Sequence, residues 1–348
     1  MNIRRFYLAA IFLLSLALFY QYSLERDAVA VGEQLQLAEK AKAKRAELES
    51  GLVYLENDLL TLIVRVGDGS IVEARVNKYL VENVEGSLGV RIFGSDATSG
   101  FKYYFKSGFT NTPGSYVFDR YVDDGIVLLS EDGVYSKTIK FAESSYEISI
   151  IDELVGAASS PGIPYASLYR TNSRSLDMNF EFSSGGLINR SSYEAYALST
   201  NQDPYEADRL RSVDGPVGAT SSGGWIAFTQ KYFLAALLGS DEYIYGYKIG
   251  QGKSGVYSMG YTVEPGDFST GYVTNHTHRL FLGPKIRKDL VERADNLEQT
   301  IEMGWFWFIS QPMVWLLDKI HDVVGSWGWS VVVITLLLKL VLWPVTGA

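Results

Sequence analysis

The chain has 348 residues, and its 31 Lys and Arg against 40 Asp and Glu give a net charge of −9. This length allows about two folded domains, and the acidic balance argues against binding to nucleic acid, which needs a basic surface. The absence of cysteine excludes disulfides, zinc–thiolate sites and thiol nucleophiles. An aromatic content of 14% provides the large apolar side chains of a packed core, which excludes a disordered chain.

The first apolar segment covers residues 6–24 and follows Arg4 and Arg5. As a helix it is about 28 Å long, close to the roughly 30 Å of a bilayer core. Because positive residues stay on the cytoplasmic side, residues 1–5 are expected in the cytoplasm and residue 25 outside. The alternative is a cleavable signal peptide, since residues 28–30 (Ala-Val-Ala) resemble a cleavage site. Charged residues separate that site from the apolar segment, so we expect an uncleaved transmembrane anchor over 6–24.

A second apolar segment covers residues 326–346 near the C-terminus. Trp327 and Trp329 at its start and Trp343 at its end fit the aromatic belts of a membrane-spanning helix, and we expect them to be interfacial anchors. Two spans leave everything between them outside and return the chain to the cytoplasm near Pro344. A buried core helix is the alternative interpretation.

Three segments connect these spans to the centre of the chain. Residues 25–51 are rich in helix formers but have a weak apolar face, which predicts a helical or flexible linker. Residues 284–311 predict a helical connector over 285–299, followed by an aromatic segment. Residues 312–325 predict an amphipathic helix, with Ser310 as its cap and Pro312 in its first turn. We expect that helix to lie in the membrane interface; packing on the central domain is the alternative.

Residues 52–283 show the period-two alternation of β-strands, separated by Gly-, Asp- and Ser-rich turns. Many short strands without helical periodicity indicate a β-sandwich. The polar stretch 172–223 predicts long loops. The strands we expect are Leu59–Val66, Ile71–Val76, Ile126–Leu129, Tyr135–Phe141, Tyr146–Leu154, Trp225–Phe228, Tyr232–Leu238, Tyr243–Ile249, Val256–Val263 and His278–Leu282.

Residues suited to catalysis are scarce. His276 and His278 alternate on a predicted strand, so both rings could face the same side, but two ligands without a third make a poor metal site. Residues 252–254 (Gly-Lys-Ser) lack the first glycine of a phosphate-binding loop, and a Gly-x-Ser-x-Gly nucleophile motif is missing. We therefore expect a protein that is not an enzyme and that uses no cofactor or metal.

Lys339 is an ionisable residue inside the second predicted span, and Thr335 lies on the same helical face four residues earlier. A charge at that depth is costly, so it usually faces protein or a water-filled cavity. Because Lys339 is close to Pro344, it could instead extend its ammonium group to the membrane interface. Spacing alone leaves both interpretations open.

Several segments carry a resemblance to a known family. They are Gly304–Pro312 (Gly-Trp-Phe-Trp-Phe-Ile-Ser-Gln-Pro), Ile320-His321, Gly325–Gly328, Val333–Thr335 and Lys339 to Pro344 in the C-terminal part, and Ser222–Ala227, Gln230–Phe233 and Leu282–Lys285 earlier. This pattern resembles the YidC membrane-protein insertases of Gram-negative bacteria. The resemblance implies a multi-pass protein of the bacterial inner membrane with a periplasmic β-supersandwich, similar in shape to sugar-mutarotase domains.

The resemblance also implies a function. Members of this family insert and fold nascent membrane proteins without covalent chemistry, alone or with the Sec translocon and SecDF. Their groove carries a positive residue, usually arginine, at the position of Lys339, and Thr335 matches another groove position. Lysine keeps the charge but lacks the planar donor fork of arginine.

Family members continue with further transmembrane helices, whereas this chain stops at Ala348. We therefore expect it to be the N-terminal part of an insertase. The alternatives are a membrane-tethered carbohydrate-binding protein and a periplasmic scaffold without a transport role.

Overall fold

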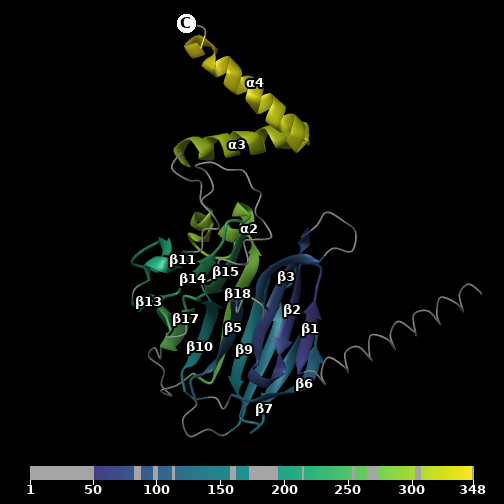
Figure 1. Ribbon diagram of the computed structural model, residues 1–348, viewed down its shortest axis with the longest axis vertical. Helices are drawn as coiled ribbons and strands as arrows, with labels where there is room; N and C mark the ends of the chain where they lie inside the picture. Colours follow the sequence, from purple (N-terminus) through teal and green to yellow (C-terminus); the bar gives the residue numbers. More distant parts are fainter. Residues whose placement is uncertain are drawn as a thin grey trace, which may run out of the picture. The chain divides into compact units, whose positions relative to one another are not determined.

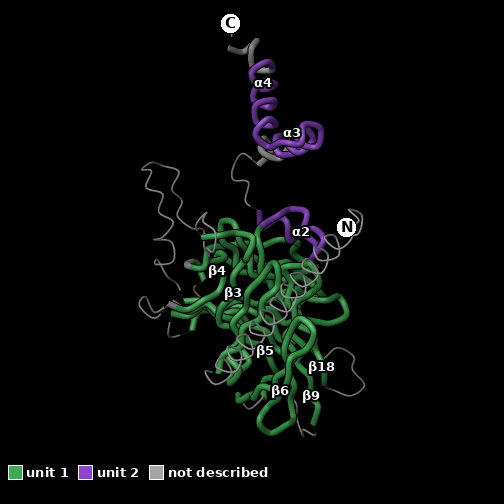
Figure 2. Tube along the Cα trace, turned by 90° about the vertical axis from the view of Figure 1, so that its right-hand side faces the viewer, with its two compact units in different colours: residues 1–284 green, residues 285–348 purple. Residues whose placement is uncertain are grey.

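The computed structural model describes residues 51–81, 88–96, 101–111, 114–156, 162–171, 195–213, 215–252, 255–264, 273–301 and 307–346. The chain divides after Pro284 into a β unit and a smaller helical unit (Figure 2). The anchor predicted at 6–24 and, except for Gly51, the linker predicted at 25–51 lie outside the described residues.

The β unit consists of two nine-stranded sheets in which each described pairing is antiparallel (Figure 1). The first sheet has the order β1 (Leu52–Glu56), β2 (Leu60–Arg65), β3 (Ser70–Leu80), β4 (Gly89–Asp96), β5 (Phe101–Phe109), β10 (Pro164–Thr171), β17 (Val256–Glu264), β16 (Ile244–Gln251), β13 (Val217–Ser222). The second has the order β12 (Glu206–Arg209), β11 (Ala195–Ser199), β14 (Trp225–Thr229), β15 (Phe233–Leu238), β18 (Asn275–Pro284), β9 (Glu147–Leu154), β8 (Tyr135–Phe141), β7 (Gly125–Ser130), β6 (Tyr116–Val122). Two short 3-10 helices, η1 (Val66–Asp68) and η3 (Leu210–Ser212), lie between strands.

Alternating burial along the strands places the core between the two sheets. In β8, every second residue from Tyr135 to Phe141 is buried, as the period of two along a strand requires. Rings from the two sheets meet in this layer: Tyr103 of β5 lies edge-on to Phe228 of β14, with ring centroids 5.7 Å apart. The largest fully buried side chains include Trp225, Tyr245 and Tyr247. The predicted, mainly β sandwich is thus confirmed.

Several strands were not predicted. The polar stretch expected to form loops contains β11, β12 and β13, so that prediction is wrong for its described part. The strands β12 (Glu-Ala-Asp-Arg) and β13 (Val-Gly-Ala-Thr-Ser-Ser) carry little apolar alternation. Each occupies the edge of a sheet, where pairing with a single neighbour holds it in place.

The helical unit contains α2 (Arg287–Val291), η4 (Leu297–Thr300), α3 (Trp307–Val324) and α4 (Trp327–Thr346). The segment predicted as a helical connector, 285–299, contains two short helices, α2 and η4, and Asn296, in a left-handed conformation with φ 64°, immediately precedes η4. The helix predicted to begin near Pro312 begins at Trp307 instead, so Pro312 lies inside it. Gly325, with φ 70°, ends α3, and its N–H donates to the His321 carbonyl at 2.7 Å.

The second predicted span, 326–346, begins one residue before α4 and ends with it. Within the described residues, no helix combines the length and the apolar character needed to cross a membrane. Membrane crossing by 326–346 therefore stays a prediction.

Candidate functional site

The two residues predicted to line a groove lie one turn apart on α4. Lys339 and Thr335 are both exposed, as their spacing of four residues predicts for one helical face. The hydroxyl of Thr335 donates to the Val331 carbonyl at 2.6 Å, so its oxygen remains available as an acceptor. A positive charge and a hydroxyl acceptor thus stand side by side, and their role stays a prediction.

The predicted tryptophan anchors also lie on α4. Trp327 and Trp329 are exposed at its first turn, with 55% and 65% of their surface accessible. The ring of His321 from α3 stacks on Trp327, with centroids 3.9 Å apart and planes 8° from parallel. This stack joins α3 to α4 across the turn at Gly325. Trp343 belongs to the last turns of α4, but its side chain lies outside the described part of the chain.

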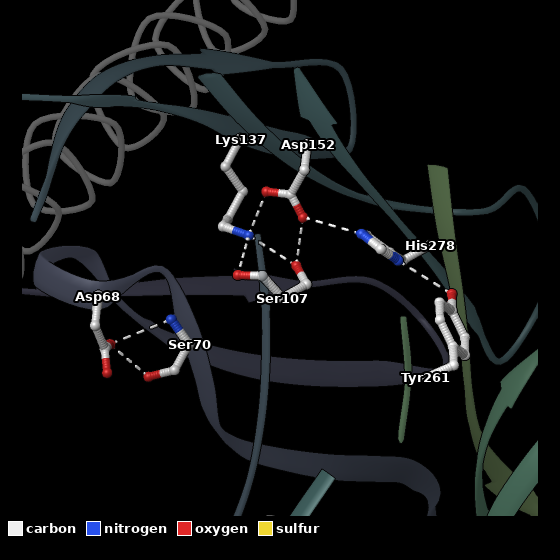
Figure 3. Close-up of polar contacts among 7 residues, drawn as sticks. All are labelled: Asp68, Ser70, Ser107, Lys137, Asp152, Tyr261 and His278. Atoms are coloured by element: carbon white, nitrogen blue, oxygen red, sulfur yellow. Dashed lines mark hydrogen bonds and ion pairs between the residues drawn. The ribbon is translucent and has the colours of Figure 1, made fainter. Parts of the chain in front are cut away.

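A second group of polar residues lies inside the β unit, between the sheets (Figure 3). We call it the inter-sheet polar cluster. Its members are Ser107 (β5) and Tyr261 (β17) from the first sheet, and Lys137 (β8), Asp152 (β9), His276 and His278 (β18) from the second. All of them are buried in a mainly apolar layer, which also contains the buried Arg170 of β10.

An ion pair forms the centre of this cluster. Lys137 Nζ lies 2.5 Å from Asp152 Oδ1 and donates to the hydroxyl and the carbonyl of Ser107 at 2.7 and 3.0 Å. The Ser107 hydroxyl donates to Asp152 Oδ2 at 2.6 Å. Burial raises the pKa of Asp152, but Lys137 and His278 outweigh it and hold that pKa below its ordinary value. Asp152 is therefore ionised, and the pair ties β8 and β9 to β5 of the other sheet.

His278 connects the carboxylate to the first sheet. Its Nε2 lies 3.3 Å from Asp152 Oδ2 without the alignment of a good hydrogen bond, and its Nδ1 lies 3.0 Å from the Tyr261 hydroxyl. Burial lowers the pKa of His278 despite the nearby Asp152. We therefore assign the neutral tautomer with the proton on Nε2, which faces the carboxylate while Nδ1 accepts from Tyr261.

His276 is the least satisfied member of the cluster. Neither of its buried ring nitrogens has a hydrogen-bond partner among the described residues. Its ring lies edge-on to Tyr243 and to His278, at centroid distances of 4.8 and 4.6 Å. Burial lowers the pKa of His276 to about 3, and the nearby His278 contributes to this lowering. His276 is therefore neutral at physiological pH and behaves largely as an aromatic packing residue.

The geometry of the cluster favours a structural role. Its groups are sealed from solvent and pair mainly with one another, so a substrate cannot reach them. The described residues contain no group of three His, Asp or Glu that could hold a metal ion.

The expectation that His276 and His278 face the same side is confirmed, but Lys137 and Asp152 were not predicted as members of the cluster. Their signal was present: each occupies an inward position of an alternating strand (Tyr-Ser-Lys-Thr-Ile-Lys-Phe and Glu-Ile-Ser-Ile-Ile-Asp-Glu-Leu).

Two clefts lie on the outer face of the first sheet. One, of about 400 Å³, crosses β1 to β4; it includes Glu73 and Arg75, whose side chains pair at 2.6 Å. The other, of about 350 Å³, crosses β10, β17 and β16, with hydroxyls of Tyr165, Ser167 and Thr262 in its lining and a floor at Gly246 and Gly260. Both linings contain hydroxyl groups and charged side chains, but no lining hydroxyl is hydrogen-bonded to a carboxylate or an amine of the same cleft, so neither indicates an active site.

Comparison with known proteins identifies relatives. The sequence profile of the YidC periplasmic domain matches residues 52–316, which include the sandwich and the first half of α3. The membrane protein insertase YidC of Pseudomonas putida strain F1 is 30% identical over 336 residues, covering 89% of this chain and 58% of the relative. That of Coxiella burnetii strain Dugway 5J108-111 is 30% identical over 317 residues, covering 84% and 54%. This chain thus spans little more than half the length of these relatives.

Solved structures align at lower identity. YidC from Thermotoga maritima gives a TM-score of 0.37 at 13% identity, covering 85% of this chain and 70% of that one. A galactose mutarotase-like protein from Lactobacillus casei gives a TM-score of 0.40 at 10% identity, covering 67% of this chain and 100% of that one.

Proposed function

Because the chain belongs to the family of the YidC periplasmic domain, we propose that it works in the insertion and folding of bacterial inner-membrane proteins. The observation that carries this proposal is the match over residues 52–316 together with the insertases among its relatives. The family is that of a periplasmic domain, so the sandwich belongs on the periplasmic side of the inner membrane. We further propose a multi-pass arrangement in which 6–24 and 326–346 cross the bilayer.

The mechanism we propose is non-covalent. A positive charge and polar groups facing a wet groove within the bilayer would lower the free energy of moving polar substrate segments through lipid. Lys339 would supply the charge and Thr335 an acceptor for water or substrate backbone. Their exposure on one face of α4 supports this arrangement. Such a mechanism needs no nucleotide, metal or covalent intermediate.

The proposed partners follow from this activity. Nascent membrane proteins would be the substrates and the lipid bilayer the medium, with the Sec translocon and SecDF as associated machinery. A carbohydrate-binding or purely scaffolding role is not favoured, because the relatives reported above are insertases.

A chimera tests the proposal. Residues 52–346 would replace the matching segment of the Pseudomonas putida insertase, in cells depleted of their own insertase. We expect the chimera to insert a reporter membrane protein, measured by protection of its translocated segment from added protease. The unaltered insertase is the positive control, and a chimera with the groove charge removed reports the contribution of α4. A chimera that reaches the membrane in normal amount but inserts no reporter would overturn the proposal.

A further inference from the structure

Exposed apolar side chains lie at both ends of the sandwich. At the end where β9 finishes they are Val117, Val155, Ile163 and Ile244. At the end where β3 finishes, five residues form what we call the apolar end patch, and between 38% and 64% of each is accessible: Tyr79, Leu80, Val81, Leu88 and Tyr232. The Val81 N–H donates to the Leu88 carbonyl at 3.0 Å, so the end of β3 and the approach to β4 lie side by side. The ring of Tyr79 packs edge-on against Phe233, the neighbour of Tyr232, at 5.7 Å. The patch therefore bridges the ends of both sheets.

The chain leaves the β unit at this same end. Phe233 is paired with Pro284, the last residue of β18 and of the unit. The strands β3 and β18 also contact each other. Wherever the helical unit lies, its connection to the sandwich therefore starts beside the patch. Val155, which follows β9, lies at the opposite end. The N–H of the preceding Leu154 donates to the carbonyl of Thr274, so the end of β9 lies beside the start of β18.

The composition of the patch suits the boundary between lipid and water. Tyrosine is enriched at that boundary, and lysine can bury its stem in apolar surroundings while its ammonium group stays in water. Lys231 Nζ lies 4.9 Å from the centroid of the Tyr232 ring, and Lys78 is exposed beside Tyr79. Both charges complement anionic lipid headgroups. An exposed apolar cluster of this kind marks an interaction surface more often than a bare solvent face.

Exposed acidic residues also lie at this end. Glu56 and Asp58 flank the turn between β1 and β2, beside the end of β3. Asp123 and Asp124 form the turn between β6 and β7 at the far edge of the second sheet, away from β15. The β15 side of the patch, with Lys231 and Tyr232, therefore lies farthest from these acidic turns.

We propose that the apolar end patch docks on the outer surface of the lipid bilayer, with Tyr79, Leu88 and Tyr232 entering the headgroup region. This inference rests on the proposed function, since it requires the chain to be anchored in a membrane. Docking at the β3 and β15 ends tilts the sandwich, because the acidic turns are repelled by anionic headgroups. It fixes the height and the direction in which the periplasmic unit stands above the membrane.

The cysteine-free chain allows a clean test with single labelled positions. The full chain carrying Tyr232→Cys, modified with an environment-sensitive fluorophore, is reconstituted into phosphatidylethanolamine and phosphatidylglycerol vesicles that contain a lipid-borne quencher. Val155→Cys is the matched control: Val155 is 51% exposed and Tyr232 59%, and the ten residues of β18 separate the two ends by about 33 Å. Leu88→Cys provides a second position in the patch.

We expect the labels at 232 and 88 to lose at least twice as much fluorescence to the quencher as the label at 155. Equal quenching at all three positions in chains that float with the vesicles would overturn the docking proposal and leave the proposed function intact. Labels at 232 and 88 that are shielded from water but out of reach of the quencher would mean that a protein covers the patch, which also overturns it. Failure of the chain to float with vesicles would instead contradict the membrane anchoring itself.

Discussion

Lys137 and Asp152 face each other on neighbouring strands, 2.5 Å apart, with at most 1% of either side chain exposed. A buried ion pair gains little over a well-packed apolar pair, because both charges must leave water. Removing one partner, however, leaves the other charge buried and uncompensated. Each charge therefore depends on its partner on the neighbouring strand, and Ser107 of the other sheet bonds to both.

Replacing Asp152 by Asn should lower the free energy of unfolding by about 3–5 kcal/mol, since Lys137 would remain buried without a counter-charge. Urea unfolding followed by circular dichroism measures this. Glu153→Gln, at the adjacent exposed position, is the control and should change stability by no more than about 0.5 kcal/mol. The double variant Lys137→Met with Asp152→Leu should recover most of the loss. A loss below about 1 kcal/mol in Asp152→Asn would show that the pair matters little.

Stability should fall as the pH falls from about 6.5 towards 3. Burial lowers the pKa of His276 in the folded protein to about 3, from 6.5 in the unfolded chain, and lowers that of His278 as well. In this window the unfolded chain binds protons that the folded chain does not, and each such histidine contributes up to about 1.4 kcal/mol per pH unit. Above pH 6.5 these histidines are neutral in both states, so they no longer make the free energy of unfolding depend on pH.

The histidine pair can be separated from other acid effects by one substitution. His276→Leu should flatten the dependence of unfolding free energy on pH between 4 and 6, measured from urea midpoints at half-unit steps. The unmodified protein, measured in the same series, is the control. The same slope in His276→Leu and in the unmodified protein would assign the acid sensitivity elsewhere.

Gly260 should tolerate no side chain. A Cβ atom at this position would lie 2.0 Å from the Ala166 carbonyl oxygen, because β10 and β17 approach closely there. Gly260→Ala should therefore cost about 1–3 kcal/mol through forced separation of the strands. Gly250→Ala on β16 has a nearest neighbour at 3.9 Å and should change stability by no more than about 0.5 kcal/mol. Thermal unfolding of the two variants side by side decides the matter, and equal midpoints would contradict the close approach.

Lys339→Leu, built into the chimeric insertase, should impair substrates with acidic translocated segments most and neutral ones least. Lys339→Arg should preserve insertion, because the charge remains. Protease protection of two reporters that differ only in their acidic residues gives the comparison. Lys319→Leu removes a charge from α3, where Lys319 pairs with Asp322 at 3.6 Å, and serves as the control. Full activity of Lys339→Leu on both reporters would make Lys339 an interfacial anchor.

Alternation in the sequence was a good guide wherever one face of a strand is apolar, as in β8, β9 and β18. It failed at β12 and β13, which exist because a neighbour pairs with them. For the polar cluster, alternation shows that Lys137 and Asp152 point inward, but not what they meet. Ser107 lies 45 residues from Asp152, and only the packing of the two sheets brings them together. Long-range pairing of this kind has no local signature.

The sheet order has a consequence for the timing of synthesis. The last strand among the described residues, β18, does not lie at an edge but between β15 and β9 in the middle of the second sheet. Until it arrives, that sheet is split in two, and its core-facing residues lack a central neighbour. Contacts between such distant segments form slowly. The first sheet contains only strands that precede residue 275, so its pairing does not depend on β18. The second sheet, and with it the closed sandwich, can be completed only after residues 275–284 have been made.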